Sequence, residues 1–346
     1  MSRLRTALAG GLLALPALAF ALPGGPAQAQ TAASKGSGSQ CVLRGVVRMP
    51  ANLPIYDKSS GGEAFARFTG SDTALAASEF PANPKKGRAQ VQTGTGTGSF
   101  RVAGYTDASR IPVHTDVAIP IVSGHLYIGA KRTVNVIAAS TGRLKIQQQL
   151  KKPIQQTFTA WASCSTLTLT TSTPLGWSVP GHSRGYVVKQ DQVTLYDDWH
   201  PGRSEVTALA RAPGGNGILL WSDKRRGAYV HVEYHGAITL NAWARARDLK
   251  ALPPGETMDE LAGPVTKPNP PRLQLQSNPQ VVKTTKEVPL RIEAKDDGKV
   301  VGLIEKDTET YVIDTVAGWA NVLPKALNIA PYGGHQFWVK ASDLGL

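Results

Sequence analysis

One short signature recurs four times in this chain and constrains its fold more than any other feature. In each occurrence, an aromatic residue is followed six positions later by Leu or Ile. The recurrence indicates a chain built from similar structural units. The spacing between successive aromatic residues is irregular, so the units do not form a tight solenoid. The four pairs are Tyr105 with Ile111, Trp161 with Leu167, Trp243 with Leu249, and Trp338 with Leu344.

Two further segments precede each aromatic residue, always in the same order. A strand-like segment that begins with glycine lies closer to it, and an opening segment with alternating apolar residues lies further upstream. Such alternation is typical of a half-buried β-strand. The third glycine-led segment is one residue out of register if its Val230 is the counterpart of Val91 and Ile146 in the first two segments. The glycines are Gly87, Gly142, Gly227 and Gly318, and the opening segments begin at Leu53, Ile119, Val193 and Val288.

The composition agrees with a chain of short strands. The 346 residues include 35 Gly and 24 Pro, a richness that favours many strands and turns over long helices. We therefore predict an all-β fold.

The last unit contains V-P-L-R from Val288, Y-V-I-D from Tyr311 and F-W-V-K-A-S-D-L ending at Leu344. With these motifs, it resembles a bacterial SH3-like (SH3b) domain. The third unit is similar but looser, and the first two are recognised by analogy with the others. The resemblance implies an exported protein with about four tandem small SH3-like β-barrels. A unit of about 60 residues is marginal alone, and closing a barrel removes exposed strand edges. The motifs are V-P-L-R from Val288, V-V-G-L-I from Val300, a charged turn at Lys306 and Asp307, Y-V-I-D from Tyr311, G-W-A-N-V from Gly318 and F-W-V-K-A-S-D-L ending at Leu344.

These patterns give a predicted organisation of the chain. The first two units form either separate barrels or one joined body, and the second departs most from the others. The proline-rich linker is typical of an extended spacer; the alternative is a proline-rich ligand for another protein. The predicted segments are a signal peptide (1–29), an N-terminal linker and strand (30–48), SH3-like units (49–112, 113–172, 183–251 and 287–346, the first two divergent) and the proline-rich linker (252–286).

The first residues have the pattern of a cleavable export signal. Arg3 and Arg5 precede an apolar run over residues 7–22, and Ala27 and Ala29 form a small-x-small cleavage site. An anchoring helix is the alternative, but the run is short and interrupted by glycines and a proline. No other segment reaches about 18 consecutive apolar residues, so we predict no transmembrane segment in the mature chain. The protein is expected to be exported, and either periplasmic or secreted.

The chain has two cysteines, Cys41 and Cys164. Export permits disulfides, and one bridge between the two is their simplest use. Two buried free thiols, or a cysteine nucleophile, are the alternatives.

The charge suggests what the protein meets outside the membrane. The formal net charge is +13, and removal of the signal with its two arginines leaves +11. A basic exported protein attracts anionic polymers, although the charge could equally serve solubility alone. We predict no specific nucleic-acid partner.

The sequence contains one match to a catalytic motif. Residues 181–185 fit the G-x-S-x-G elbow, with Ser183 as nucleophile, but the elbow needs a strand before and a helix after it. His231 and His235 would lie roughly 13 Å apart on a strand, too far for one metal ion. We interpret the basic run 224–226 as a solvated turn. The expectation is no enzyme, no metal site and no cofactor.

The candidate ligand-binding residues are aromatic. The closing aromatic residues of the four units are assigned to the cores. Better candidates lie in the long loop and late turn of each unit, because exposed aromatic rings supply much of the binding energy in grooves. These are Tyr56, Tyr196, Trp199, Trp319 and Tyr332. The predicted function is a non-catalytic binding protein for peptidoglycan or another envelope component, as the resemblance implies. A structural protein that bridges envelope proteins is the alternative, and a cell-wall hydrolase is the third.

Overall fold

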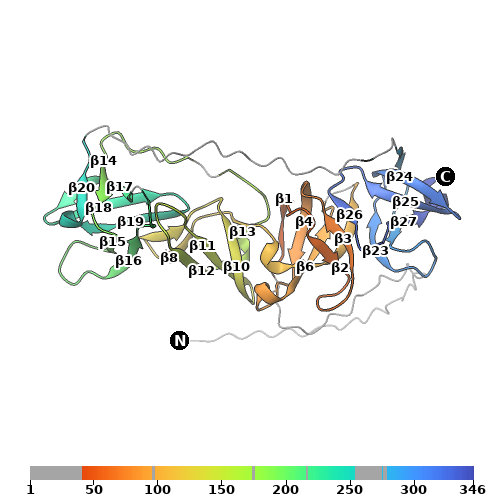
Figure 1. The fold of residues 1–346 in the computed structure, drawn as a ribbon, viewed down its shortest axis with the longest axis horizontal. Coiled ribbons are helices and arrows are strands. Elements are labelled where there is room, and N and C mark those ends of the chain that lie inside the picture. The colour runs from red at the N-terminus through yellow and green to blue at the C-terminus, as the bar shows by residue number, and fades with distance from the viewer. Residues whose placement is uncertain (1–40, 96–97, 174–175, 216, 254–274, 276–278) are drawn as a thin grey trace, which may run out of the picture. The chain divides into compact units, whose positions relative to one another are not determined.

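A computed structural model describes residues 41–95, 98–173, 176–215, 217–253, 275 and 279–346 (Figure 1). The predicted signal peptide 1–29, and residues 30–40 of the predicted N-terminal segment, lie outside the described residues. Most of the predicted proline-rich linker 252–286 lies outside them too. Within the described ranges, no helix is long and apolar enough to cross a membrane.

The all-β prediction is confirmed. The described residues form three antiparallel sheets, and their helical segments are short 3-10 turns. These turns are η1 (Pro84–Lys86), η2 (Ala108–Arg110), η3 (Cys164–Thr166), η4 (Ala246–Asp248) and η5 (Ala341–Leu344).

The first and last parts of the chain share one 13-stranded sheet. Its main path runs β1-β4-β5-β6-β23-β22-β27-β25-β24-β21, with β2, β3 and β26 paired beside it. The early strands are β1 (Leu43–Arg48), β2 (Pro54–Tyr56), β3 (Ala64–Phe68), β4 (Asp72–Ser78), β5 (Arg88–Thr93) and β6 (Phe100–Asp107). The late strands are β21 (Gln280–Lys283), β22 (Val288–Arg291), β23 (Val300–Ile304), β24 (Glu309–Val316), β25 (Trp319–Pro324), β26 (Ile329–Pro331) and β27 (Trp338–Lys340).

The middle of the chain forms the other two sheets. One has the order β12-β11-β10-β7-β13. The other has the order β16-β15-β19-β18-β17-β14-β20, with the β8–β9 hairpin added through β9 and β19. The strands are β7 (Val113–Thr115), β8 (Ile119–Val122), β9 (Leu126–Ile128), β10 (Thr133–Ser140), β11 (Arg143–Gln149), β12 (Thr157–Ser163), β13 (Leu167–Thr168), β14 (Arg184–Val188), β15 (Gln192–Tyr196), β16 (Glu205–Ala210), β17 (Leu219–Arg226), β18 (Tyr229–His235), β19 (Ile238–Arg245) and β20 (Leu249–Ala251).

Closed barrels, which the sequence predicted, do not form in the described residues. Three strands instead pair with a strand from a distant part of the chain. β6 pairs with β23, β3 with β26, and β9 with β19. A strand edge must satisfy its backbone N–H and C=O groups, and pairing across parts of the chain does so as well as closure does.

The pairing of β6 with β23 depends on a glycine. Gly302 lies opposite Val102, and a Cβ atom at Gly302 would come within 1.9 Å of the Arg101 carbonyl oxygen. Only glycine allows this approach of two backbones. The contact continues beyond the strands, where the Ser99 amide donates to the Glu305 carboxylate over 3.1 Å and Arg101 forms an ion pair with Glu305.

Each opening segment forms the first strand of a hairpin. The hairpins are β2–β3, β8–β9, β15–β16 and β22–β23, and each has a register shift near the end of its first strand. In three of them, the first strand also pairs with the strand that carries the closing aromatic residue. The opposed residues are Tyr56 and Tyr105, Tyr196 and Trp243, and Arg291 and Trp338. Among the described strands, β8 pairs only with β9.

Each closing signature is a strand followed by a 3-10 turn. The turn begins three residues after the aromatic residue. The first amide of the turn donates to a carbonyl oxygen at the start of the glycine-led strand. The bonds run from Ala108 to Gly87 (3.1 Å), Cys164 to Gly142 (3.1 Å), Ala246 to Ala228 (2.8 Å) and Ala341 to Gly318 (2.9 Å). The repeated sequence elements therefore meet at one repeated backbone hydrogen bond.

The assignment of all four closing aromatic residues to cores is wrong in part. Trp243 is buried at 7% exposure, but Trp161 is 44% exposed, with the Arg143 guanidinium 5.7 Å from its ring centroid. Tyr105 and Trp338 are half-buried. Smaller apolar residues fill the space instead, in two clusters. One includes residues from 41–169 and 288–344, and the other includes residues from 126–249.

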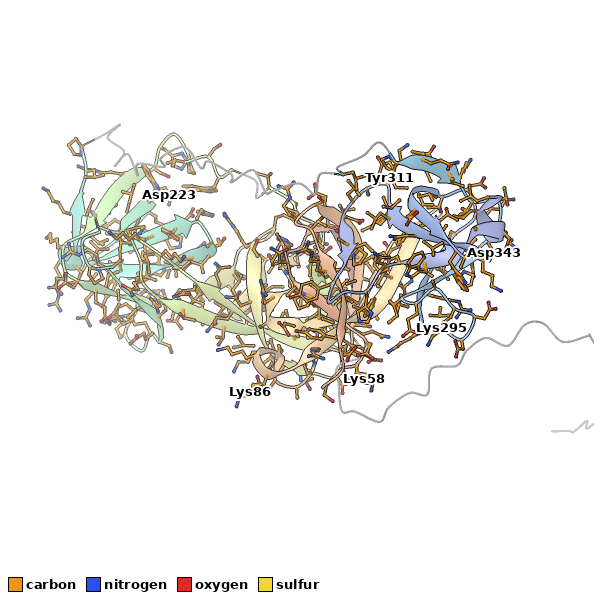
Figure 2. The ribbon with its side chains drawn as sticks, turned by 45° about the vertical axis from the view of Figure 1, so that its right-hand side comes forward. Lys58, Lys86, Asp223, Lys295, Tyr311 and Asp343 are labelled. Atoms are coloured by element: carbon orange, nitrogen blue, oxygen red, sulfur yellow. A yellow bond between two sulfur atoms is a disulfide. The ribbon has the colours of Figure 1, made fainter. Side chains whose placement is uncertain are left out.

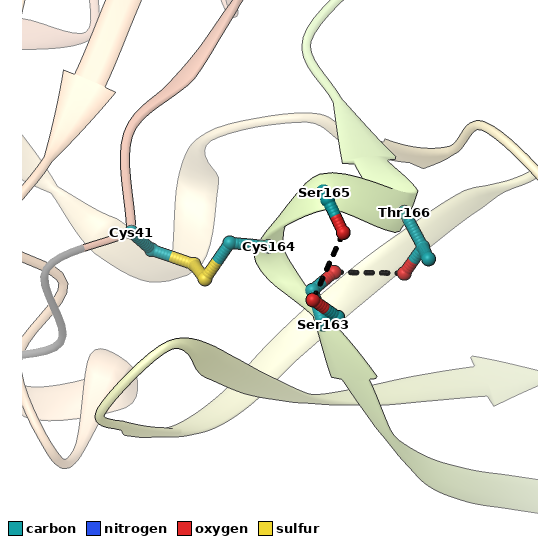
Figure 3. Close-up of a disulfide and its surroundings, with 5 residues drawn as sticks. All are labelled: Cys41, Ser163, Cys164, Ser165 and Thr166. Atoms are coloured by element: carbon teal, nitrogen blue, oxygen red, sulfur yellow. Dashed lines mark hydrogen bonds between the residues drawn. A yellow bond between two sulfur atoms is a disulfide. The ribbon is translucent and has the colours of Figure 1, made fainter. Parts of the chain in front are cut away.

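Cys41 and Cys164 form a disulfide, as predicted (Figure 3). Their Cα atoms are 5.4 Å apart, and 123 positions separate them in sequence. Beyond the bridge, the amide of Leu169 donates to the Arg44 carbonyl oxygen over 3.1 Å. The bridge and this bond together fasten β1 to the segment that follows η3.

Candidate functional site

Three of the predicted ligand-binding aromatic residues each lie under a single cation. The Arg88 guanidinium lies 3.3 Å from the Tyr56 ring centroid, the Lys340 ammonium 5.9 Å from Trp319, and the Arg67 guanidinium 6.0 Å from Tyr332. Among the described residues, none of these three rings contacts another aromatic ring. They are single aromatic surfaces, not one site.

The other two predicted residues belong to a larger group, here called the aromatic cluster. The Tyr196 and Tyr229 ring centroids are 6.1 Å apart, nearly perpendicular. Trp199 lies 6.5 Å from Trp243, which in turn lies 4.9 Å from a histidine ring. The sequence pointed to Tyr196 and Trp199 as candidates and placed Trp243 in the core. Tyr196 lies opposite Trp243 in the pairing of β15 with β19, which brings the two groups of rings together. The aromatic cluster consists of Tyr196, Trp199, His200, Tyr229, His231 and Trp243.

The loop between β15 and β16 positions Trp199. The Asp197 carboxylate accepts from the Ser204 amide over 2.7 Å, which closes the loop. The Asp198 carboxylate accepts from the Trp199 amide, also over 2.7 Å, and bonds the His200 ring. The bond to His200 lowers the pKa of Asp198 below its ordinary value. Both carboxylates therefore stabilise the conformation of this loop.

A surface cavity of about 630 Å³ lies beside the aromatic cluster and shares Tyr229 with it. Four of its seven lining residues are arginines, and none is acidic. We call it the arginine pocket. It is lined by Arg203, Arg225, Ala228, Tyr229, Arg245, Ala246 and Arg247.

Neutral groups hold two of these arginines against the aromatic rings. The Arg203 guanidinium lies 4.5 Å from the Tyr229 centroid and 5.1 Å from the Tyr196 centroid. Its Nη1 donates to the His200 carbonyl oxygen over 3.1 Å. Arg245 lies 5.5 Å from the Tyr196 centroid, and its side-chain hydrogen bond to Tyr229 raises the pKa of the guanidinium. Both guanidinium groups therefore lie against tyrosine rings.

Carboxylates do little to neutralise the pocket. Arg225 donates from Nε to the Gly227 carbonyl oxygen over 3.2 Å. Arg247 lies 3.7 Å from the Asp248 carboxylate, a long contact at an exposed side chain. Arg203, Arg225 and Arg245 have no ion pair with any described residue. The pocket thus presents a concentrated positive charge.

The sequence contained a signal for this pocket that reasoning missed. The closing segment W-A-R-A-R-D-L has arginine two and four residues after its tryptophan, whereas the other three closing segments have Ser109, Ser165 and Ser342 at the second of these positions. Interpreting residues 224–226 as a solvated turn also passed over Arg225, which lines the pocket. Arg203 carried no signal, because only the folded loop brings it to Tyr229.

The G-x-S-x-G stretch does not have the structure of a nucleophile elbow. Residues 181–182 form a turn, and β14 follows directly, where an elbow would have a helix. The Ser183 amide donates to the Pro180 carbonyl oxygen over 2.9 Å. His182 lies 3.5 Å from Asp223 of β17, labelled in Figure 2.

The two histidines of β18 have separate surroundings. His231 packs on Trp243, while His235 stacks on Trp177 with 4.1 Å between ring centroids. Across the described residues, no group of three or more His, Cys, Asp or Glu side chains could hold a metal ion.

Comparison with known proteins gives no family for this chain: no family model, no curated protein and no solved structure matches it.

Proposed function

We propose that this protein is a non-catalytic, exported binding protein that recognises an anionic component of the cell envelope, with peptidoglycan as the first candidate. The observation that carries the proposal is the surface of residues 184–251. There the aromatic cluster adjoins a pocket with four arginines and no acidic lining residue.

The two halves of this surface suit different parts of such a ligand. Aromatic rings bury much apolar area at low entropic cost and suit the faces of sugar rings or peptide side chains. Guanidinium groups form paired hydrogen bonds with carboxylate or phosphate oxygens. An anionic polymer of sugars and peptides offers both kinds of group.

The finer assignment to SH3-like units is part of the same proposal. Its support is the element order that recurs at all four signatures: a hairpin with a register shift, a glycine-led strand, an aromatic strand and a 3-10 turn. Export is supported by the Cys41–Cys164 bridge, because disulfides persist in oxidising compartments.

A structural role in bridging envelope proteins remains the second candidate. β21 is the last strand on the path of the large sheet, and it pairs only with β24 among the described strands. Exposed apolar side chains lie there, with Val281 at 46% and Ile313 at 38% exposure. Such an edge suits addition of a strand from a partner.

The test is sedimentation of the protein, without residues 1–29, with purified sacculi over a salt series. Specific recognition predicts binding that persists at high salt, where screening removes nonspecific attraction. Trp199→Ala should reduce the bound fraction several-fold, whereas Tyr332→Ala, at an exposed ring outside the aromatic cluster, should not. Loss of all binding at high salt in the wild type would reject the proposal and favour protein partners.

A further inference from the structure

We propose that the arginine pocket binds a phosphoryl group, either a phosphomonoester or a phosphodiester. The inference rests on the proposed function and narrows it to an anionic envelope component that carries phosphoryl groups, such as a lipid or a polymer attached to the wall.

The first step is charge. Arg203, Arg225 and Arg245 face no carboxylate within ion-pair distance among the described residues. The one nearby carboxylate among them is Asp248, which lies 3.7 Å from Arg247 and also helps to raise the pKa of Arg245. Like charges this close repel one another, so an anion in the pocket relieves an unfavourable interaction as well as forming new ones. Anion binding should therefore also stabilise the folded protein.

The second step is the fixed placement of the guanidinium groups. Carbonyl oxygens and tyrosine rings, all neutral, hold three of them, and each guanidinium has five N–H donors. One bond to the His200 carbonyl oxygen leaves other Nη donors of Arg203 available, whereas its buried Nε lies out of reach of a ligand. A ligand with many acceptors would find the donors already arranged.

The third step separates phosphoryl from carboxylate. A carboxylate has two oxygens and one charge, and a single bidentate arginine satisfies it. A phosphoryl group offers two or three free oxygens, and a monoester carries nearly two charges at neutral pH. Four arginines around one cavity of about 630 Å³ match the larger demand. The aromatic cluster at Tyr229 then suits the sugar or glycerol to which the phosphoryl group is esterified.

Isothermal titration calorimetry with inorganic phosphate and with acetate, at matched ionic strength, tests the inference. Phosphate should bind at least tenfold more tightly than acetate and should raise the melting temperature. Arg203→Gln with Arg245→Gln should weaken phosphate binding at least tenfold. The matched control is Arg226→Gln, on the same strand as Arg225 but outside the pocket lining, which should bind as the wild type does. Equal affinity for the two anions, or equal loss in the control, would overturn the inference.

A replacement variant and a competition experiment complete the test. If the double variant fails to fold, Arg225→Gln alone replaces it, because that side chain is exposed and its loss leaves the Tyr229 contacts intact. Vesicles of phosphatidylglycerol and soluble poly(glycerol phosphate) then compete with phosphate, and whichever competes in the wild type and not in the variant identifies a lipid or a polymer source. Phosphate binding without sacculus binding would reject peptidoglycan and retain the pocket. If the wild type bound no phosphate and a folded variant bound sacculi as the wild type does, the phosphoryl pocket would be rejected and peptidoglycan retained.

Discussion

The amide of Ala246 donates a hydrogen bond to the carbonyl oxygen of Ala228 over 2.8 Å. At the other three signatures, the equivalent acceptor is the glycine itself, as for Ala341 and Gly318. The acceptor here is one residue beyond Gly227, and His231 lies opposite Trp243 as Gln90 lies opposite Tyr105. The counterpart of Val91 is therefore Val232 and not Val230, so the strand is displaced by one residue in the direction opposite to that expected from the sequence. The shift also places Tyr229 at the start of β18, where it lines the arginine pocket.

Equivalent aromatic residues should differ in their contribution to stability. Trp243→Ala should lower the free energy of unfolding by about 3–5 kcal/mol, because it empties a buried site. Trp161→Ala should cost about 1 kcal/mol or less, since that ring is 44% exposed and gains mainly from Arg143. Urea denaturation of both variants checks this. Equal losses would mean that the two positions are structurally equivalent after all.

The sequence was sufficient for the local elements and insufficient for their partners. Alternating apolar residues at Val193 and Leu195, and the glycine at Gly318, follow from strand and turn geometry, which is local. The pairing of Gly302 with Val102 joins residues 200 positions apart, and no local pattern specifies which edge strands meet. For the same reason, closed barrels were expected where open, shared sheets occur.

The β6–β23 pairing should fail when a side chain is added at Gly302. Gly302→Ala would place a Cβ atom against the Arg101 backbone, and overpacking of this kind costs about 1–3 kcal/mol. The control is Gly181→Ala, where a Cβ atom meets nothing within 4 Å. Thermal denaturation should show a lower melting temperature for the first variant only. Hydrogen exchange should also speed up at the amides of Arg101 and Leu303, which lie opposite each other, and unchanged exchange there would contradict the pairing.

The sequence likewise predicts one part of the candidate site and not the other. Tyr196, at the end of β15, and Trp199, in the loop that follows, are recognisable from sequence because aromatic residues near a loop can supply much of the energy of binding. The arginine pocket is not, because Arg203 and Arg245 come from separate strands and loops and acquire meaning only when Tyr229 lies between them. A basic residue on a surface is ordinary, but four arginines around one cavity are not, when three of them have no acidic partner within ion-pair distance among the described residues.

The disulfide should contribute much of the stability of the first part of the chain. Joining residues 123 positions apart restricts the unfolded chain, and a loop of this length corresponds to about 4–5 kcal/mol. Replacing Cys41 and Cys164 together by alanine should lower the free energy of unfolding by that order. Wild-type protein in excess reductant should approach the variant in urea denaturation, and the variant itself should not respond to reductant. If reductant destabilised the variant by the same amount, the loss of stability in the wild type would have a cause other than the disulfide.

Acid should destabilise the protein through His114 before the carboxylates titrate. His114 of β7 is 4% exposed, and burial lowers the pKa of its imidazole. Its Nδ1 lies 3.2 Å from the Thr133 hydroxyl, and its Nε2 has no partner among the described residues. Below about pH 6.5, the unfolded state takes up a proton that the folded state does not, so stability falls as the pH falls. The slope for one proton is about 1.4 kcal/mol per pH unit.

The measurement is the free energy of unfolding from urea titrations between pH 7.5 and pH 5, a range chosen with reference to the ordinary histidine pKa. His114→Gln should flatten the decline in that window, because glutamine keeps a polar group near Thr133 and does not titrate. His182→Gln is the control, since that side chain is 73% exposed and replacing it should leave the slope unchanged. A decline as steep in His114→Gln as in the wild type would show that another group takes up the proton.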